Sequence, residues 1–380
     1  MFVWTVHLEG GPRRVNHAAV AIEEKIYSFG GYCTGEDYEK TRPMDIHILD
    51  SVSYRWKSLP IPNRKDPHYS DVPYQRYGHT AVAYKECAYV WGGRNDSQGA
   101  CNILYCFDTV ALKWSKVSVS GTIPGARDGH SACILNHKMY IFGGYEEWLD
   151  RFSNEVHSFD FATKTWMNLH SAGSPAQWRD FQSGSAIGDT MYIFGGRSDR
   201  AGPWHTNNEV YCNKIQAFRS LSQNWFEPET TGQAPFGRRS HSAFVHNGMI
   251  YIFGGYNGLH DLHFNDLYRY NAETSEWSLV KVKGQGPCPR RRQCCCVIKD
   301  RVFLFGGTSP CTDSSEGTEF NLMDHSDLYV LDMAPSLKTL CQLVVLEHNL
   351  DTSNLPHDIR WELTAMTTNN TISRPLNSSG

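Results

Sequence analysis

Arginine occupies two kinds of position in this sequence, and one of them has the chemistry of an anion-binding site. The first kind recurs in frame, three residues before a histidine or its substitute: Arg14, Arg76, Arg127, Arg179, Arg238 and Arg290. A residue that recurs at one position of every repeat is most simply architectural, because repeats reuse the contacts that join neighbours. The second kind falls outside that frame: Arg13, Arg94, Arg197, Arg200, Arg239, Arg291 and Arg292.

The out-of-frame arginines concentrate in the second half of the chain. A guanidinium group presents a planar fork of donors that matches the two oxygens of a carboxylate. Taken together, these side chains predict a pocket for a compact anion. A solvated charged rim is the alternative interpretation for any single one of them.

Acidic and aromatic residues occur close to these arginines in the pattern. They are Asp128, Asp180, Asp199, Tyr145, Trp148 and Trp178. Carboxylates attract cations, and aromatic faces accept both cations and apolar groups. We predict that this set contacts a basic or apolar group that lies next to the bound anion in the same ligand.

Catalytic and metal-binding patterns are not persuasive. His260 and His263 are spaced like a metal pair, but no third ligand follows nearby, and zinc enzymes use three protein ligands. The glycine doublets lack the Lys-Ser/Thr of a phosphate cradle, and no Gly-x-Ser-x-Gly elbow occurs. We expect a chain that is not an enzyme and that uses no metal and no cofactor.

Repeated strands predict the elements that position these side chains. An aromatic-hydrophobic run ends in a Gly-Gly doublet six times, at Gly30, Gly92, Gly143, Gly195, Gly254 and Gly306. A variable loop and another strand follow, and five copies then carry a tryptophan: Trp56, Trp114, Trp166, Trp225 and Trp277. Four strands per unit, at a spacing of roughly 50 to 60 residues, resemble the kelch repeat and predict an all-β, six-bladed propeller over residues 1–335.

The sixth unit lacks its tryptophan, and Trp4 stands alone near the N-terminus. Pro12 and Arg14 follow Trp4 at about the interval seen in other units. We therefore predict that residues 2–8 form the outermost strand of the last blade, which closes the ring without leaving an open edge.

The composition indicates which partners and which cellular compartment to expect. The net charge of −4 gives no general attraction to nucleic acid or anionic membranes, and no apolar run of membrane-spanning length occurs. The 12 cysteines form no CxxC pair, and three of them are consecutive, which favours reduced thiols over a disulfide framework. We expect a reduced, cytoplasmic protein, with the nucleus as a second compartment.

The hydrophobic period changes after Pro335. Leu337, Leu340, Cys341 and Val344 have the spacing of one helix face, and Ser336 suits an N-cap. Leu355, Ile359 and Leu363 form a second stripe, and residues 367–380 are expected to be a flexible tail. On periodicity alone, a helical hairpin folded back on the propeller is the simpler interpretation.

The same residues resemble two docking motifs. Ser336-Leu337-x-x-x-Cys341-x-x-x-Val345 is similar to an elongin B/C-binding box, with Leu340 on the same face. Leu355-Pro356-x-x-Ile359-x-x-x-Leu363 is similar to the cullin-2 box that follows it in substrate receptors of cullin-2 ubiquitin ligases. The resemblance implies that residues 336–366 bind elongin B, elongin C and cullin-2, by laying an amphipathic helix into a groove.

Kelch receptors with such a tail recognise substrate C-termini that end in glycine, often with a basic residue upstream. The resemblance implies that Arg197, Arg200, Arg239 and Ser240 hold the terminal carboxylate, and Arg292 joins this set as an out-of-frame arginine. It also implies an aromatic pocket position at Tyr145.

The chain's own Gly380 is then expected to allow self-association. A non-catalytic kelch scaffold for chromatin, recombination factors or actin remains the alternative function.

Overall fold

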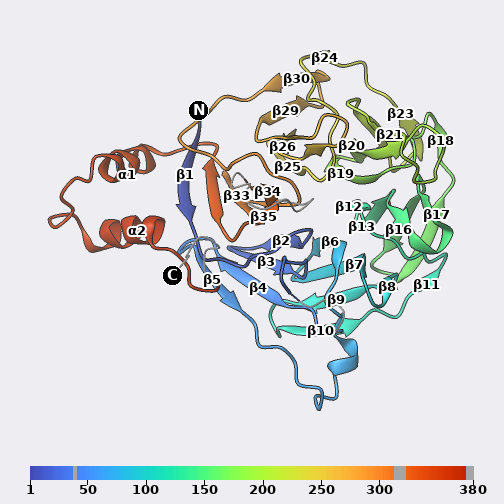
Figure 1. The fold of residues 1–380 in the computed structure, drawn as a ribbon, viewed down its shortest axis with the longest axis horizontal. Helices are drawn as coiled ribbons and strands as arrows, with labels where there is room; N and C mark the ends of the chain where they lie inside the picture. Colours follow the sequence, from blue (N-terminus) through green and yellow to red (C-terminus); the bar gives the residue numbers. More distant parts are fainter. Residues whose placement is uncertain (37–40, 312–321, 374–380) are drawn as a thin grey trace.

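The computed structural model describes residues 1–36, 41–311 and 322–373. Six small antiparallel sheets are arranged radially around a central axis, as Figure 1 shows. Two helices follow the last sheet and lie at the outer edge of the ring. The all-β, six-bladed propeller predicted from the repeats is therefore confirmed.

Each blade has four main strands. In the lists that follow, the strands of each blade run from the axis outward. The first blade contains β2 (Ala18–Ile22), β3 (Lys25–Phe29), β4 (Ile46–Asp50) and β5 (Arg55–Ser58), and the second contains β6 (Tyr77–Tyr84), β7 (Cys87–Asn95), β9 (Tyr105–Asp108) and β10 (Lys113–Lys116). The third blade contains β12 (Ser131–Leu135), β13 (Lys138–Phe142), β16 (Val156–Asp160) and β17 (Thr165–Leu169). The fourth blade contains β19 (Asp180–Ile187), β20 (Thr190–Asp199), β22 (Gln216–Arg219) and β23 (Asn224–Phe226), and the fifth contains β25 (Ser242–His246), β26 (Met249–Phe253), β29 (Leu267–Asn271) and β30 (Glu276–Leu279). The sixth blade contains β32 (Cys294–Ile298), β33 (Arg301–Phe305), β36 (Leu328–Asp332) and, outermost, β1 (Phe2–Leu8).

Shorter elements complete the sheets and loops. Four two-residue strands run parallel to an outermost strand: β11 (Ser120–Gly121), β18 (Ala172–Gly173), β24 (Thr231–Gly232) and β31 (Val282–Lys283). The loops contain η1 (Tyr69–Asp71), β8 (Gly99–Ala100), β14 (Tyr145–Glu146), η2 (Glu147–Leu149), β15 (Arg151–Phe152), β21 (Glu209–Tyr211), β27 (Tyr256–Asn257), β28 (Leu262–His263), β34 (Thr308–Pro310) and β35 (Leu322–Asp324).

Aromatic packing and the glycine doublets explain why the repeat folds as a blade. The five repeat tryptophans are buried, and Trp225 packs on Phe142 of the preceding blade at 5.2 Å between ring centroids. Gly195 has φ +68°, and a Cβ placed there would lie 2.4 Å from the carbonyl oxygen of Arg238 in the next blade. The doublet therefore lets adjacent blades approach closely.

The N-terminal strand closes the ring as predicted. Strand β1 covers Phe2–Leu8 and pairs antiparallel with β36 of the sixth blade. Trp4 contacts Tyr329 in an edge-on arrangement at 5.8 Å, and Val6 and Leu8 are buried in the core between the first and sixth blades. One sheet thus joins the first residues of the propeller to its last repeat.

A second closure surrounds the axis. Each residue two places after an in-frame arginine has a left-handed backbone, and its N–H donates to the carbonyl of its counterpart in a neighbouring blade. These residues are Asn16, Gly78, Gly129, Phe181, Ser240 and Arg292. The six N···O distances run from 2.7 to 3.2 Å and form a continuous circle. The circle fixes where the following side chains meet the central opening.

The in-frame arginines are architectural. All six are buried, and five donate from Nη1 to the carbonyl of the first glycine of their doublet, as Arg179 does to Gly195 at 2.8 Å. Arg14 binds the carboxylate of Asp45, and Arg127, Arg238 and Arg290 each bind a carboxylate as well. The prediction that this set is architectural is confirmed, although these bonds lie within one blade and do not join neighbouring blades.

The two helices form an antiparallel hairpin. Helix α1 covers Leu337–Glu347 and begins at Ser336, whose Oγ accepts from the N–H of Thr339 at 3.1 Å, so the predicted N-cap is present. Helix α2 covers His357–Thr367. Glu362 of α2 joins them by accepting from Lys338 and Gln342 of α1 at 2.7 and 2.6 Å.

One face of the hairpin packs on the propeller. Leu363 and Met366 of α2 are buried, and Leu343 and Leu346 of α1 pack on the core around β1. The expected folded-back hairpin is therefore present, with part of its surface still exposed. Within the three described segments, no helix is both long and apolar enough to span a bilayer.

The structure differs from the expected flexible tail over 367–380. Residues 369–373 run along the propeller, where Asn370 donates from its backbone N–H to Glu9 at 2.8 Å. The Asn370 side chain accepts from the N–H of Trp56 at 3.0 Å and donates to the carbonyl of Tyr54 at 3.1 Å. Backbone groups of the first blade hold this segment, so the prediction of a flexible tail is wrong for residues 369–373. Residues 374–380, including Gly380, lie outside the described part.

Candidate functional site

A pocket opens at the mouth of the propeller, over the circle of backbone hydrogen bonds. Its volume is about 530 Å³. Its lining residues are Asn16, Tyr32, Tyr77, Arg94, Asp96, Asp128, Tyr145, Asp180, Phe181, Arg197, His205, Arg239 and Arg292. Four of the six residues that directly follow a Gly-Gly doublet are among them.

The repeat explains why these side chains meet. In every blade, the residue after the in-frame arginine pairs with the residue after the doublet, as Asp180 does with Arg197 and Arg239 with Tyr256. The same two positions in different blades therefore carry whichever side chains the site needs. The repeat therefore fixes where these side chains lie, and the residue types at the out-of-frame positions determine what the pocket can bind.

One half of the pocket contains paired charges. Asp180, which is 1% exposed, accepts from Nε and Nη2 of Arg197 at 3.1 and 2.6 Å. This carboxylate holds the pKa of Arg197 above its ordinary value, although burial acts in the opposite direction. Glu209 lies 3.6 Å from the same guanidinium. Arg197 is thus already neutralised from within the protein.

Asp128 lies next to that pair and has a different environment. Burial, followed by the negative charge of Asp180, raises the pKa of Asp128 to about 7, against the opposing influence of Arg94 and Arg197. Arg94 itself lies 3.3 Å from Glu147. This half of the pocket therefore contains more carboxylate than guanidinium and favours a cationic group.

The other half of the pocket is cationic. Arg239 of the fifth blade and Arg292 of the sixth line it, and Arg291 lies beside them. Within residues 1–36, 41–311 and 322–373 no carboxylate lies within ion-pair distance of any of the three. The Nε of each is buried without a hydrogen-bond partner in that part of the chain. Burial and the charges of Arg292 and Arg239 lower the pKa of Arg291 to about 10.

Aromatic rings support these arginines in place of acids. Arg291 lies over the ring of Tyr256 at 4.1 Å, and Arg239 lies 5.6 Å from the same ring. Arg292 donates from Nη1 to the hydroxyl of Tyr32. Cation–π contacts position a guanidinium without cancelling its charge. The three side chains are therefore held close together while their charge stays available to an anion.

The structure brings most of the predicted site residues together. Arg197, Arg239, Arg292, Tyr145, Asp128 and Asp180 line the pocket. Ser240 belongs to the axial circle beneath it, and its carbonyl accepts from the N–H of Arg292 at 2.8 Å. The roles assigned to these residues remain predictions.

Four predicted residues, Asp199, Arg200, Trp148 and Trp178, are not among the residues that line the pocket. Asp199 accepts from the N–H groups of Ala201 and Thr206 at 2.8 and 2.7 Å, which turns the loop so that Arg200 is exposed outside the pocket. Trp148 is 93% exposed and lines a neighbouring surface groove with Glu147. Trp178 is half-buried and is also absent from the pocket lining.

Sequence reasoning missed several lining residues. Asn16, Tyr77, Asp96, Phe181 and His205 line the pocket but were not assigned to it. The repeat contained a usable signal for two of them, because Asn16 and Phe181 occupy the frame position where Gly78 and Gly129 stand in other units. A residue larger than glycine at that position projects a side chain at the axis.

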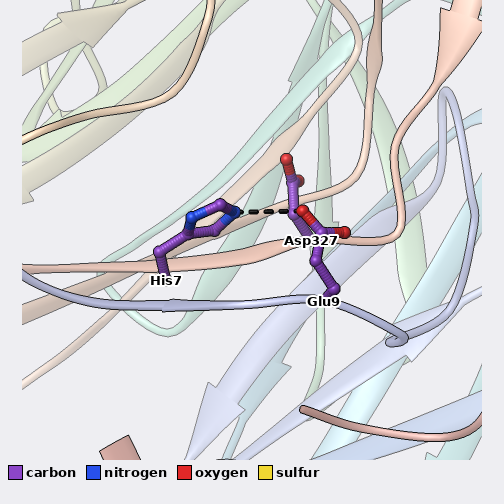
Figure 2. Close-up of side chains that lie close together, drawn as sticks. All are labelled: His7, Glu9 and Asp327. Carbon is purple, nitrogen blue, oxygen red and sulfur yellow. Dashed lines mark hydrogen bonds and ion pairs between the residues drawn. The ribbon is translucent and has the colours of Figure 1, made fainter. Parts of the chain in front are cut away.

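Two histidine clusters do not support a metal site. Figure 2 shows His7, Glu9 and Asp327 close together, with His7 and Glu9 joined at 3.1 Å. Asp327 already accepts from Arg290 at 2.6 and 2.8 Å, so a second cation would meet an occupied carboxylate. Near His260 and His263, whose spacing resembles a metal pair, Tyr256 packs on His263, and burial together with Arg291 lowers the pKa of His263 to about 4.

The helical hairpin presents an apolar face outward. Leu337 is 78% exposed, Val344 is 48% exposed and Cys341 is exposed, whereas Leu340 and Val345 are half-buried. In the second motif Pro356 is exposed, and Leu355 and Ile359 are half-buried. Leu363 instead packs α2 on the propeller and is not presented to a partner.

Comparison with known proteins agrees with this architecture. A family model described as KLHDC2/KLHL20/DRC7 Kelch-repeats domain matches residues 78–307, and a Kelch motif matches residues 13–63. Kelch domain-containing protein 3 of Bos taurus is 58% identical over 380 residues, which is 100% of both chains. The Homo sapiens protein of that name is 57% identical over the same length.

More distant relatives match this chain over only part of their own length. Host cell factor of Drosophila melanogaster is 27% identical over 333 residues, which cover 82% of this chain and 21% of that protein. The full-length matches to Kelch domain-containing protein 3 and the matches of the kelch models agree with the six-bladed ring. This chain belongs to the kelch-repeat family and is closely related to Kelch domain-containing protein 3.

Proposed function

We propose that the chain is the substrate-recognition subunit of a cullin-2 RING ubiquitin ligase. In this role the pocket binds protein C-termini that end in glycine, with a basic residue upstream, and thereby promotes their ubiquitination and proteasomal degradation. The chain itself carries out no bond-making step, since ubiquitin transfer belongs to other subunits. We expect the complex to act in the cytoplasm, with the nucleus as a second compartment.

The observation that carries the proposal is the cluster of Arg239, Arg291 and Arg292. Three buried Nε–H groups without a partner in the described segments are costly unless a ligand supplies acceptors. A terminal carboxylate supplies two oxygens in one plane, which matches a guanidinium fork. Each charge-assisted hydrogen bond contributes about 1.5–3 kcal/mol, so two or three are enough to hold a short peptide end.

The opposite half of the pocket supports the upstream preference. Asp128 and Asp180 line the same cavity as Arg239 and Arg292. A peptide that places its carboxylate at the arginines reaches these acids with an earlier residue, and a lysine or arginine there gains a favourable charge. A terminal glycine lacks a Cβ, which lets the peptide backbone approach the arginines closely.

The hairpin supports the ligase side of the proposal. Elongin B and C would engage the exposed face of α1 that carries Leu337 and Cys341, and cullin-2 would engage the start of α2 near Leu355 and Pro356. The buried face of the hairpin holds this platform rigidly on the first and sixth blades. The substrate pocket and the platform would then move as one body.

Peptide binding tests the substrate assignment. A fluorescent peptide ending in Arg-Gly with a free carboxylate should bind, and the same peptide amidated at its C-terminus should bind at least tenfold more weakly. Arg239→Ala should weaken the free peptide to a similar degree. Arg200→Ala is the matched control, because Arg200 is exposed outside the pocket. Equal affinity for the free and amidated peptides would rule out carboxylate recognition.

Co-purification tests the ligase assignment separately. The full chain expressed with elongin B, elongin C and cullin-2 should purify as a complex, and Leu337→Ala with Cys341→Ala should remove these partners. Leu350→Ala is the control, because Leu350 is exposed but lies between the two motifs. Peptide binding without elongin association would instead favour the alternative of a non-catalytic scaffold.

A further inference from the structure

Cys288 lies in a charged setting that the pocket does not use. Its sulfur is 3.3 Å from Nη2 of Arg290 and 3.6 Å from Nε2 of His325. The imidazole of His325 also contacts Ser309 Oγ at 2.7 Å through Nε2, and its Nδ1 lies 3.6 Å from Asp327. A thiol, an imidazole, a guanidinium and a carboxylate thus meet beside the sixth blade.

Arg290 departs here from the pattern of the other in-frame arginines. In four blades the Nε of that arginine donates to the carbonyl two residues earlier, as Arg238 does to Phe236 at 3.0 Å. The Nε of Arg290 is buried and has no partner among the described residues, although Arg290 is only 1% exposed. Nε and Nη2 share one edge of a guanidinium, so the orphan donor lies on the side that meets the Cys288 sulfur.

Positive groups outweigh negative ones around the sulfur. Partial burial alone would raise the thiol pKa, but the hydrogen bond from His325 and the charge of Arg290 lower the pKa of Cys288 to about 7. Asp327, which lies 3.6 Å from His325, is neutralised by Arg290 through both oxygens. Tyr329 also lies close enough to interact with this thiol. A substantial fraction of Cys288 is therefore thiolate near neutral pH.

We propose that Cys288 is a peroxide-reactive thiol, oxidised to a sulfenate that Arg290 holds. The thiolate sulfur attacks one oxygen of hydrogen peroxide, so that an S–O bond forms as the O–O bond breaks. The electron pair leaves with the second oxygen as hydroxide, which removes the proton of the sulfenic acid and departs as water. Sulfur is oxidised by two electrons and peroxide is reduced by two. The sulfenate oxygen then gives the orphan Nε–H of Arg290 its missing acceptor.

Most of the other cysteines lack this thiolate character. Burial raises the thiol pKa of six of them: Cys33, Cys106, Cys133, Cys294, Cys295 and Cys296. Cys341 is exposed on α1 and lies far from the cluster in sequence. Oxidation by peroxide needs both an accessible sulfur and thiolate character. Comparing Cys288 with the exposed Cys341 therefore tests whether exposure alone is enough for oxidation. This chemistry is independent of what the pocket binds.

The test uses the reduced full-length protein at about pH 6.5 with dilute hydrogen peroxide and dimedone, which traps sulfenic acids. Peptide mass spectrometry should find the adduct at Cys288 at least tenfold faster than at Cys341, and Cys288→Ser should abolish it. His325→Gln should slow labelling of Cys288 about tenfold while the thermal midpoint stays unchanged. Labelling that favours Cys341, or that leaves Cys288 unmodified in the folded protein, overturns the proposal. An unchanged rate in His325→Gln would overturn the activation by the cluster.

Discussion

Asp128 and Asp180 lie in the same pocket and differ in the partner that each has. Asp180 binds Arg197 through both oxygens, whereas Asp128 is buried with no ion-pair partner among the described residues, and its pKa rises to about 7. A carboxyl group whose native pKa exceeds its unfolded value takes up a proton on folding. Its contribution to stability is therefore present below the unfolded pKa and is lost as the pH rises toward 7.

Asp128→Asn should remove this pH-dependent cost. We expect the thermal midpoint of the variant to match the parent near pH 4 and to exceed it increasingly up to about pH 7.5. Differential scanning calorimetry across that range measures the effect. Asp96→Asn is the control, because the Asp96 side chain is 58% exposed in the same pocket. A constant difference between Asp128→Asn and the parent would show that Asp128 does not titrate in this range.

Arg197 and Arg239 should separate stability from binding. Arg197→Met leaves the Asp180 carboxylate buried and unpaired, a change that costs about 3–5 kcal/mol. Arg239→Met removes one charge from a cluster of three, and we expect its effect to stay below about 1 kcal/mol or to be stabilising. Denaturant unfolding of both variants provides the comparison. Equal destabilisation would contradict the division of the pocket into paired and unpaired halves.

At the scale of elements, the helical hairpin depends on the segment that follows it. Asn370 binds the backbone N–H of Trp56 and the carbonyl of Tyr54, so it fastens the end of α2 to β5 and the turn before it. Figure 1 shows α1 and α2 at the rim, with β1 and β5 as the strands nearest to them. The platform is therefore anchored at the same place where the N-terminal strand enters the ring.

Asn370→Ala should loosen this anchor without unfolding the blades. Loss of the two hydrogen bonds leaves buried backbone groups unpaired, which costs about 1–3 kcal/mol. Hydrogen–deuterium exchange should accelerate within α2 and remain unchanged in the third blade. Exposed Thr371 provides the control variant Thr371→Ala. Faster exchange throughout the propeller would show instead that the segment supports the whole ring.

Elements that recur were the easiest to predict from the sequence. Six glycine doublets and five tryptophans define the blades, and Trp4 replaces the missing tryptophan, so the bounds 2–8 of β1 were predicted correctly. Arg200 was misplaced because its position depends on how Asp199 turns one loop, which the repeat does not specify. The pairing of Arg197 with Asp180 was also missed, although both stand at repeat positions that pair in every blade.

At the scale of the whole molecule, two circles hold the six blades together. The inner circle is the ring of backbone hydrogen bonds around the axis, and every blade contributes one donor and one acceptor to it. The outer closure is a single strand, β1, which pairs with β36 and with the short parallel strand β31. The inner circle contains six equivalent hydrogen bonds, one from each blade, whereas the outer closure depends on the seven residues of β1.

The N-terminal strand is therefore where the ring should be most sensitive to change. Val6 is 4% exposed and packs in the core between the first and sixth blades, so Val6→Ser removes buried apolar surface and adds a hydroxyl. We expect a loss of about 2–4 kcal/mol, measured as a lower denaturant midpoint. His7 lies next to it on the opposite, exposed face, and His7→Ser should cost less than about 1 kcal/mol.

Deletion of residues 2–8 extends the same argument. It exposes the edge of β36 and the core behind it, and an open hydrophobic edge promotes association between chains. We expect the truncated protein to lose its cooperative thermal transition and to aggregate, as seen by circular dichroism and light scattering. A truncated protein that stays monomeric and melts at the parental temperature would show that the inner circle alone is sufficient to close the propeller.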